Sequence, residues 1–394
     1  MKFKLISLVI ATTISSSSFS ANEYWYSDGE AIKLSEKNTQ AHLTENAGKP
    51  VIHIEKPDNN GVSHNFFDEF SVGKKGLFIN NKNNADVIIN EVISDSQSIL
   101  SGNIKIVFNN ADLIIANPNG ITCDGCSTTN VRNTTLITGK ITDSANKTDP
   151  LSYQTTDGKI QIINTSNFNN NKKNAENNKL SLIANNISIK NSSINVPDIF
   201  IKTTETNEYI SHKTGEYSQS HTPGILTEDT AEERKPSLLY IDESSSVSSD
   251  VLKIDANSGH VFNKGNIKSY KNEINLSHVF LSNRGNITSG MSDITSLYSS
   301  IYNRGNITAQ KLNMSFNDTY RHFDINEKNY IPAQFAFVND GVIKGGFANI
   351  DSRGADLKND GHINMWGRTN ITLHNEYDIT GHKLINNGTI LNQY

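Results

Sequence analysis

The sequence predicts an all-β protein built as a parallel β-helix, and three observations carry that prediction. The 394 residues include 54 asparagines and 25 glycines but only 8 prolines, a composition typical of many tight turns. A short motif recurs through the last third of the chain, often at a spacing of 20 residues. The segments between its copies are brief, rich in β-formers and bounded by turn residues, which favours strands over helices.

The repeated motif consists of an apolar residue, an asparagine, a glycine and an isoleucine, each separated from the next by one residue. The asparagines are Asn263, Asn283, Asn303, Asn339, Asn359 and Asn386. The glycines are Gly265, Gly285, Gly305, Gly341, Gly361 and Gly388, and the isoleucines are Ile267, Ile287, Ile307, Ile343, Ile363 and Ile390. Spacings of 20, 20, 36, 20 and 27 residues indicate one repeating unit with occasional insertions, as in a solenoid.

Each unit is expected to place a strand end at the asparagine, a glycine with positive φ at the turn, and an inward isoleucine in the next strand. Equivalent residues would then stack about 4.8 Å apart, where asparagines can form hydrogen-bonded ladders. The rival interpretation is an antiparallel sandwich in which each Asn-x-Gly closes a hairpin. Leucine-rich repeats have a similar period, but their spaced leucine pattern is missing.

The start of the chain has the features of a secretory signal peptide, predicted over residues 1–20. Lys2 and Lys4 precede an apolar run from Leu5 to about Ile14, and a stretch of small residues, Ser15 to Ser18, follows, with Ser18 and Ser20 placed for cleavage before Ala21. The run is shorter than the roughly 20 apolar residues of a membrane-spanning helix. With 36 basic against 41 acidic residues and no long basic cluster, nucleic-acid binding is not expected.

Two segments depart from the strand pattern. Residues 165–178 are rich in Asn and Lys without periodicity, which predicts an exposed loop. Residues 203–236 contain Pro223 and Pro236 and almost no aliphatic pattern, so they are expected to leave the stack as a long loop or hairpin. A tolerated surface insertion and a binding loop both remain open for this second segment.

A family resemblance rests on ordered blocks within residues 61–139. These are Gly61–Phe66, Phe70–Val72, Gly76–Leu77, Asn80–Asn81, Ile89–Val92, Ser98–Gly102, Ala111–Ile121, Cys123–Cys126 and Thr135–Gly139. The chain thereby resembles the two-partner secretion domain, or haemagglutination-activity domain, of filamentous haemagglutinins, haemolysins and related bacterial exoproteins. Weaker similarity runs through residues 180–196 and 240–267. The family usually has Gly-Phe-Ile-Asn after the second cysteine, and Ser127–Asn130 here leaves the local packing open.

The resemblance implies a route of export. Family members cross the inner membrane through the general secretory machinery and remain unfolded in the periplasm. An outer-membrane β-barrel transporter, whose periplasmic domains recognise this region, then threads them to the cell surface, where they fold as right-handed β-helices. The expected location is therefore the surface or surroundings of a Gram-negative bacterium. The expected partners are that transporter, the secretory machinery and a host-cell receptor.

The predicted organisation has three parts: a signal peptide at 1–20, a two-partner secretion domain at 21–270, and a shaft of repeats at 271–394. The predicted function is that of an adhesin or haemagglutinin. The alternative is a haemolysin, cytolysin or contact-toxin exoprotein that lacks its C-terminal effector.

The predicted secretion motif is Asn117-Pro118-Asn119-Gly120. Proline fixes φ, asparagine tolerates left-handed geometry and glycine relieves a strained position, so the four residues form a complete turn signal. The resemblance implies that this turn shapes the part recognised by the transporter, or folding beside it. The alternative is that it merely ends the strand from Leu113 to Ala116.

Cys123 and Cys126 form a single Cys-x-x-Cys pair. Zinc would need two further ligands at suitable spacing, and none is present nearby. A thioredoxin-type redox site requires a helix start, which this strand-rich region does not offer. A small structural disulfide, formed after entry into an oxidising compartment, is the expected outcome.

No catalytic site, metal or cofactor is predicted. Polysaccharide-cleaving β-helices, the distant alternative, need paired carboxylates or an acidic groove that binds calcium. The candidate acids are instead scattered at strand ends: Asp242, Glu243, Asp250 and Asp255. Glu228 and Asp229 are adjacent, so on an extended backbone their side chains would point apart.

Overall fold

The fold was obtained as a computed structural model. It describes residues 18–19, 22–142, 151–166, 168, 178–205, 209–213, 216–219, 235–318, 321–324, 329–332, 334–374 and 382–392. Most of the predicted signal peptide, and Glu228 and Asp229, lie outside these residues. Every regular element in the described ranges is a β-strand. No helix in those ranges could therefore serve as a membrane span.

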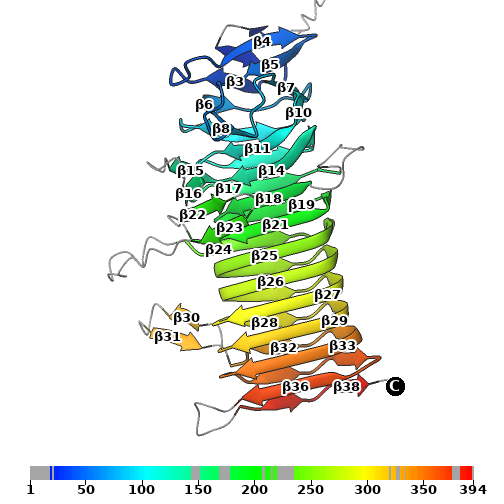
Figure 1. The fold of residues 1–394 in the computed structure, drawn as a ribbon. Helices are drawn as coiled ribbons and strands as arrows, with labels where there is room; N and C mark the ends of the chain where they lie inside the picture. Colours follow the sequence, from blue (N-terminus) through cyan, green and yellow to red (C-terminus); the bar gives the residue numbers. More distant parts are fainter. Residues whose placement is uncertain are drawn as a thin grey trace, which may run out of the picture.

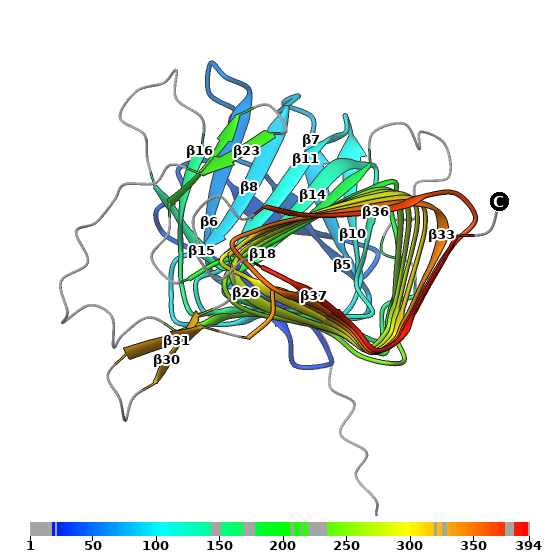
Figure 2. The ribbon, with the colours of Figure 1, turned by 90° about the horizontal axis from the view of Figure 1, so that it is seen from below.

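The chain winds into an elongated stack of turns, and each turn has a roughly triangular outline (Figures 1 and 2). Strands of successive turns pair in parallel along the stack, as between β25 (Ser246–Asn263) and β26 (Asn266–Asn283). This arrangement confirms the right-handed parallel β-helix. The hairpin alternative is wrong, because its repeats would pair antiparallel.

The regular part of the stack follows the repeat found in the sequence. After β25 and β26 come β27 (Asn286–Leu297), β28 (Ser300–Asn303), β29 (Asn306–Asn317), β32 (Phe337–Asn339), β33 (Val342–Arg353), β34 (Leu357–Asn359), β35 (His362–Met365), β36 (Thr369–His374), β37 (Leu384–Asn386) and β38 (Thr389–Asn392). The antiparallel hairpin of β30 (Arg321–Asp324) and β31 (Asn329–Pro332) lies in the insertion that lengthens one spacing to 36 residues.

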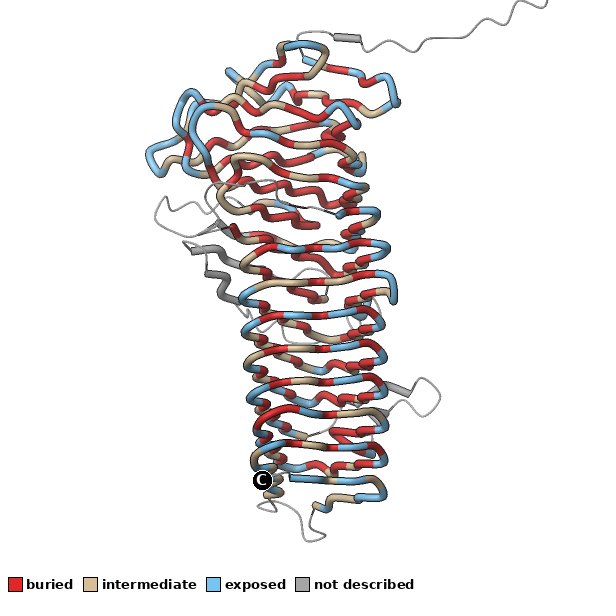
Figure 3. Tube along the Cα trace, turned by 90° about the vertical axis from the view of Figure 1, so that its right-hand side faces the viewer, coloured by how far each residue is buried: buried red, intermediate tan, exposed pale blue. Residues whose placement is uncertain are grey.

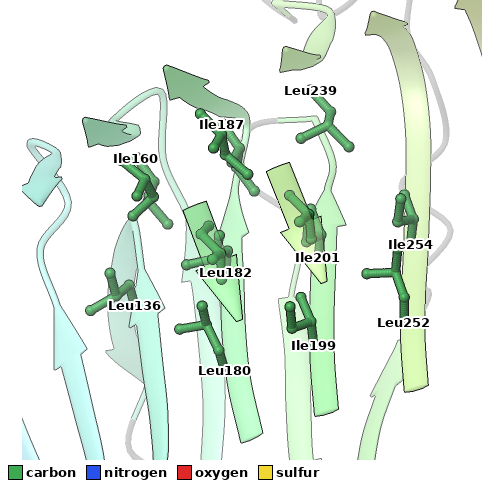
Figure 4. Close-up of a cluster of buried hydrophobic side chains, with 14 of the residues drawn as sticks. Leu136, Ile160, Leu180, Leu182, Ile187, Ile199, Ile201, Leu239, Leu252 and Ile254 are labelled. Carbon is green, nitrogen blue, oxygen red and sulfur yellow. The ribbon is translucent and has the colours of Figure 1, made fainter. Parts of the chain in front are cut away.

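The repeat isoleucines line the interior. Ile267 pairs with Ile287, and Ile287 pairs with Ile307, one turn further along. All three are at most 3% exposed, and only the last member of the column, Ile390, is partly exposed. Figure 3 shows buried positions along the length of the stack, and Figure 4 shows the same kind of column earlier in the chain, for example at Leu180, Ile199 and Leu252. Burial of each such side chain stabilises the fold by about 1.5–3 kcal/mol.

The repeat asparagines form the predicted ladder. The Nδ2 of each donates to the Oδ1 of the next, over 2.7–2.8 Å, from Asn263 to Asn386. All but Asn386 are buried. Because a buried amide without a partner is costly, this ladder holds successive turns in one register.

The predicted positive φ at the repeat glycines is wrong. None of Gly265, Gly285, Gly305, Gly341, Gly361 and Gly388 is among the residues with positive φ. Their requirement is space: a Cβ on Gly285 would lie 2.0 Å from the carbonyl oxygen of Gly265, and one on Gly305 would lie 2.0 Å from that of Gly285. The turns stack so closely at this corner that no side chain fits.

The first half of the stack has the same three-sided plan with less regular turns. One side contains β6 (Val62–Phe70), β8 (Val87–Val92), β11 (Ala111–Ala116), β14 (Val131–Ile137), β18 (Lys179–Ala184) and β21 (Asp198–Thr203). The second contains β9 (Ser98–Leu100), β12 (Ile121–Asp124), β17 (Lys159–Ile163), β19 (Asn186–Lys190) and β24 (Ser237–Ile241). The third contains β5 (Lys49–His53), β7 (Leu77–Asn81), β10 (Asn103–Phe108) and β13 (Ser127–Thr129). The short strand β20 (Ser193–Asn195) pairs in parallel with β25.

Antiparallel strands close the N-terminal end of the stack. They are β1 (Ser18–Phe19), β2 (Glu23–Trp25) and β3 (Ala31–Leu34), which leads onto β6, and β4 (His42–Asn46), which pairs with β5. Tyr24 is fully buried, and its hydroxyl donates to the carbonyl of Gly48 over 2.9 Å. Such a cap shields the apolar interior of the first turn from water.

A four-stranded antiparallel sheet lies beside the stack: β15 (Gly139–Thr142), β16 (Leu151–Thr155), β22 (Tyr209–Lys213) and β23 (Glu216–Gln219). In the predicted excursion 203–236, β22 and β23 form a hairpin, while most of its remainder lies outside the described residues. Within 165–178, Thr165, Phe168 and Asn178 are buried. The exposed-loop prediction is wrong for these three residues.

Candidate functional site

The predicted secretion motif forms a tight turn between β11 and β12. The amide of Gly120 donates to the carbonyl of Asn117 over 3.3 Å, which closes the turn. The Oδ1 of Asn117 accepts from the amide of Asn119 over 2.9 Å. Gly120 has φ of +123°, a value that favours glycine. The local turn chemistry predicted from Asn, Pro and Gly is therefore present.

Asn117 also binds the turn that precedes it in the stack. Its side chain is fully buried, and its Nδ2 donates to the carbonyl of Ser96 over 2.9 Å and to the Oγ of Ser98 over 2.8 Å. The Nδ2 of Asn119 donates to the carbonyl of Ser94 over 2.7 Å. The two asparagines together fix the path of residues 94–98.

The same four residues contact the following turns. The amide of Asn117 donates to the carbonyl of Ile137 over 3.0 Å. The hydroxyl of Thr156 donates to the carbonyl of Pro118 over 2.6 Å. A Cβ on Gly120 would lie 3.1 Å from the carbonyl oxygen of Lys159, so the chain passes closely here as well. The motif thus joins neighbouring turns on both sides of its own.

Burial limits what this motif can do in the folded protein. Asn117, Pro118 and Gly120 are buried, and only Asn119 is partly exposed. Another protein could not read the Asn117 side chain without unfolding the turn. Sequence reasoning identified the turn but missed Ser94, Ser96 and Ser98 as its partners, because these contacts depend on the register between turns.

The two cysteines lie on the same turn as the motif, one on the strand that follows it and one just after that strand. Cys123 is on β12, Cys126 precedes β13, and the structure joins them in a disulfide. Both are buried, and the Sγ of Cys123 lies 3.3 Å from the hydroxyl of Thr165 on the next turn. The repeat glycines form a separate column further along the stack and do not meet these residues.

The unusual Ser-Thr-Thr after the second cysteine has a local explanation. Ser127–Thr129 is strand β13, which pairs in parallel with β10. The Nδ2 of Asn103 donates to the hydroxyl of Ser127 over 2.9 Å and to that of Thr129 over 3.0 Å. The sequence left the packing of Ser127–Asn130 open. In the structure, the hydroxyl groups of Ser127 and Thr129 accept hydrogen bonds from one side chain, that of Asn103.

Across the described ranges, no three His, Cys, Asp or Glu side chains gather as ligands of one ion. Asp242 instead accepts from the hydroxyl of Ser245 over 2.5 Å and from the amide of Asn191. The Asp242 carboxylate therefore forms hydrogen bonds within its own turn and to the preceding turn of the stack.

Filamentous hemagglutinin of Bordetella pertussis is 41% identical over 110 residues, which are 23% of this chain and 3% of that protein. The 16S rRNA endonuclease CdiA of Enterobacter cloacae subsp. cloacae is 36% identical over 148 residues, 32% of this chain and 4% of that protein. The chain thus spans only a small part of the curated relatives that it matches.

Among solved structures, the crystal structure of the filamentous hemagglutinin secretion domain matches with a TM-score of 0.50 and 19% identity. The match covers 85% of this chain and 98% of that one, and it supports the fold. The family model of the TPS secretion domain matches residues 30–288, well over half of the chain. The chain therefore belongs to the TPS secretion domain family, the family of exoproteins that Gram-negative bacteria secrete across the outer membrane by two-partner secretion.

Proposed function

We propose that residues 21–270 are the module through which an outer-membrane β-barrel transporter exports this chain, and that residues 271–394 form a shaft of repeats. The observation that carries this is the family match over residues 30–288, together with a stack in which each turn contacts mainly its neighbours. Such a stack can grow turn by turn as residues emerge from a pore. Recognition by periplasmic domains of the transporter, after passage through the general secretory machinery, is part of the proposal.

The burial of Asn117-Pro118-Asn119-Gly120 sets the order of events in this proposal. The transporter reads the motif while the chain is unfolded in the periplasm, when the Asn117 side chain is accessible. After export, the same residues close the turn and bind residues 94–98. The transporter therefore recognises the motif before export, and the same residues stabilise the folded stack afterwards.

Replacing Asn117 by Ala should reduce export strongly, because it changes the motif that the transporter reads. The matched control is Ser98→Ala, which removes the Asn117–Ser98 hydrogen bond and leaves the motif intact. Each change should cost the folded protein about 1–3 kcal/mol. Export is measured as the fraction of chain outside the cell, with the transporter co-expressed. Equal export of the two variants would show that the motif acts through folding alone.

We further propose that the exported chain acts as an adhesin or haemagglutinin, through a host-cell receptor and without enzymatic activity. Similarity to filamentous hemagglutinin supports adhesion. The Hemolysin of Proteus mirabilis, 36% identical over 114 residues, supports the cytolysin alternative, and the CdiA relatives support a toxin exoprotein that lacks its effector. The regions matched in those relatives cover only 7% and 4% of their lengths.

The secreted chain should agglutinate red cells without releasing haemoglobin. Both readouts come from one incubation of purified protein with washed cells. The control is the same protein after thermal unfolding. Haemoglobin release without agglutination would favour the cytolysin and contradict the adhesin.

A further inference from the structure

An outward column of aromatic side chains is interrupted by one serine. In the parallel register, Tyr240 pairs with Phe262, Phe262 with Ser282, and Ser282 with Tyr302. The residues that alternate with them, such as Val261 and Leu281, are buried in the core. The column therefore lies on the outer surface of the stack. Since a serine is much smaller than an aromatic ring, it leaves a hollow between its neighbours.

This hollow is a surface pocket of about 270 Å³. It is lined by Tyr240, Phe262, Lys264, Ser282 and Arg284. Phe262 and Tyr302 are two turns apart, about 9–10 Å along the stack at the usual strand spacing. A flat ring laid over Ser282 would fit the opening left between them.

The pocket contains two cations, Lys264 and Arg284. Lys264 and Arg284 are exposed, and neither forms an ion pair within the described part of the chain. The Nζ of Lys264 lies 5.6 Å from the centre of the Tyr240 ring.

The charged residues before and after this pair are engaged elsewhere. One turn earlier, the Asp242 carboxylate accepts from Ser245 and from the amide of Asn191. One turn later, Arg304 pairs with Asp340 over 3.3 Å. Two positive charges therefore remain at the mouth of an aromatic hollow, on a chain whose net charge is −5.

We propose that this pocket binds an acidic sugar, a pyranose ring that carries a carboxylate. The apolar face of the ring packs over Ser282 beside the ring of Phe262, and Tyr240 lines the pocket one turn beyond Phe262. The carboxylate is held by the guanidinium of Arg284, whose fork matches its two oxygens, with Lys264 as a second cation. This combination of an apolar lining and a few convergent polar groups is typical of small-ligand sites.

A sugar-binding pocket would give the exported shaft a means to hold a surface glycan. The biological use of this site therefore rests on the proposed adhesive function. The binding of an acidic sugar is argued from the residues of the pocket alone. An acidic peptide is the other occupant that the charges allow, and the experiment separates the two. Sugar binding without haemagglutination would support the pocket and contradict the adhesin proposal. Haemagglutination without sugar binding would contradict only the proposed pocket.

The test is calorimetric titration of the purified secreted chain with tri-galacturonic acid, with neutral galactotriose and with an acidic peptide that contains Phe. The acidic trisaccharide should bind and the neutral one should not. Arg284→Gln should weaken binding roughly tenfold, the value of one charge-assisted contact. Ser282→Phe should abolish binding by completing the aromatic column.

Lys268→Gln is the matched control, since it removes an exposed cation on β26 outside the pocket. It should bind like the parent chain. Circular dichroism of every variant checks that the strands remain. Equal binding of the neutral sugar, binding of the peptide alone, or unchanged binding by both Arg284→Gln and Ser282→Phe would overturn the proposal.

Discussion

Replacing Ile287 and Ile307 together by Asp should leave the chain in the periplasm. The two side chains are 3% and 1% exposed and lie in register on successive turns. Each Asp would bury a carboxylate without a partner and remove the burial of an Ile side chain, at a cost of about 4 kcal/mol or more per site. If folding of emerging turns opposes backsliding through the transporter, two adjacent turns that cannot close should stop export.

The matched control is Thr288→Asp with Thr308→Asp. These neighbours of the two isoleucines are partly exposed, so the same charges enter the same strands without reaching the core. Export is followed by separating periplasm from medium in cells that contain the transporter. The control should be exported like the parent chain. Undiminished export of the Ile variant would show that folding of these turns does not drive transport.

Replacing Gly305 by Ala should strongly destabilise the regular part of the stack, although alanine can adopt its backbone conformation. The added Cβ would lie 2.0 Å from the carbonyl oxygen of Gly285, a backbone atom that cannot move alone. The turns must separate, which breaks nearby hydrogen bonds, including those of the Asn283–Asn303 pair. We expect a loss of about 3 kcal/mol or more. The measurement is the guanidinium midpoint followed by far-ultraviolet circular dichroism.

Gly354→Ala supplies the opposite control. Gly354 has φ of +76°, and the nearest atoms to an added Cβ are 3.9 Å away. Its substitution adds backbone strain of about 1–2 kcal/mol without a clash. The midpoint should therefore fall less for Gly354→Ala than for Gly305→Ala. The reverse order would mean that backbone conformation, and not space, selects the repeat glycines.

The regular half of the fold could be predicted because its period is visible in the sequence. When Ile267, Ile287 and Ile307 recur every 20 residues, the strand register follows directly. The reason for the glycines was not accessible in the same way. The distance between the backbones of two turns depends on tertiary stacking, whereas a positive φ is a local property that a single glycine suggests.

The first half resisted prediction because its turns differ in length. The antiparallel strands of the cap and of the side sheet show no repeat, and their pairing joins distant residues such as Tyr153 and Ile210. The secretion motif was visible as a turn, but its burial was not. Likewise, Tyr240 and Phe262 are 22 residues apart, so the pocket beside Ser282 appears only once their register is known.

The most direct measurement is where the whole chain resides in a Gram-negative cell with and without a two-partner secretion transporter. Fractionation followed by immunodetection gives the amounts in periplasm, on the surface and in the medium. We predict that the chain reaches the outside and resists protease only when the transporter is present, and that it stays protease-sensitive in the periplasm otherwise. Equal release in both strains, or folded protein in the periplasm without the transporter, would contradict a module exported through a partner and folded outside.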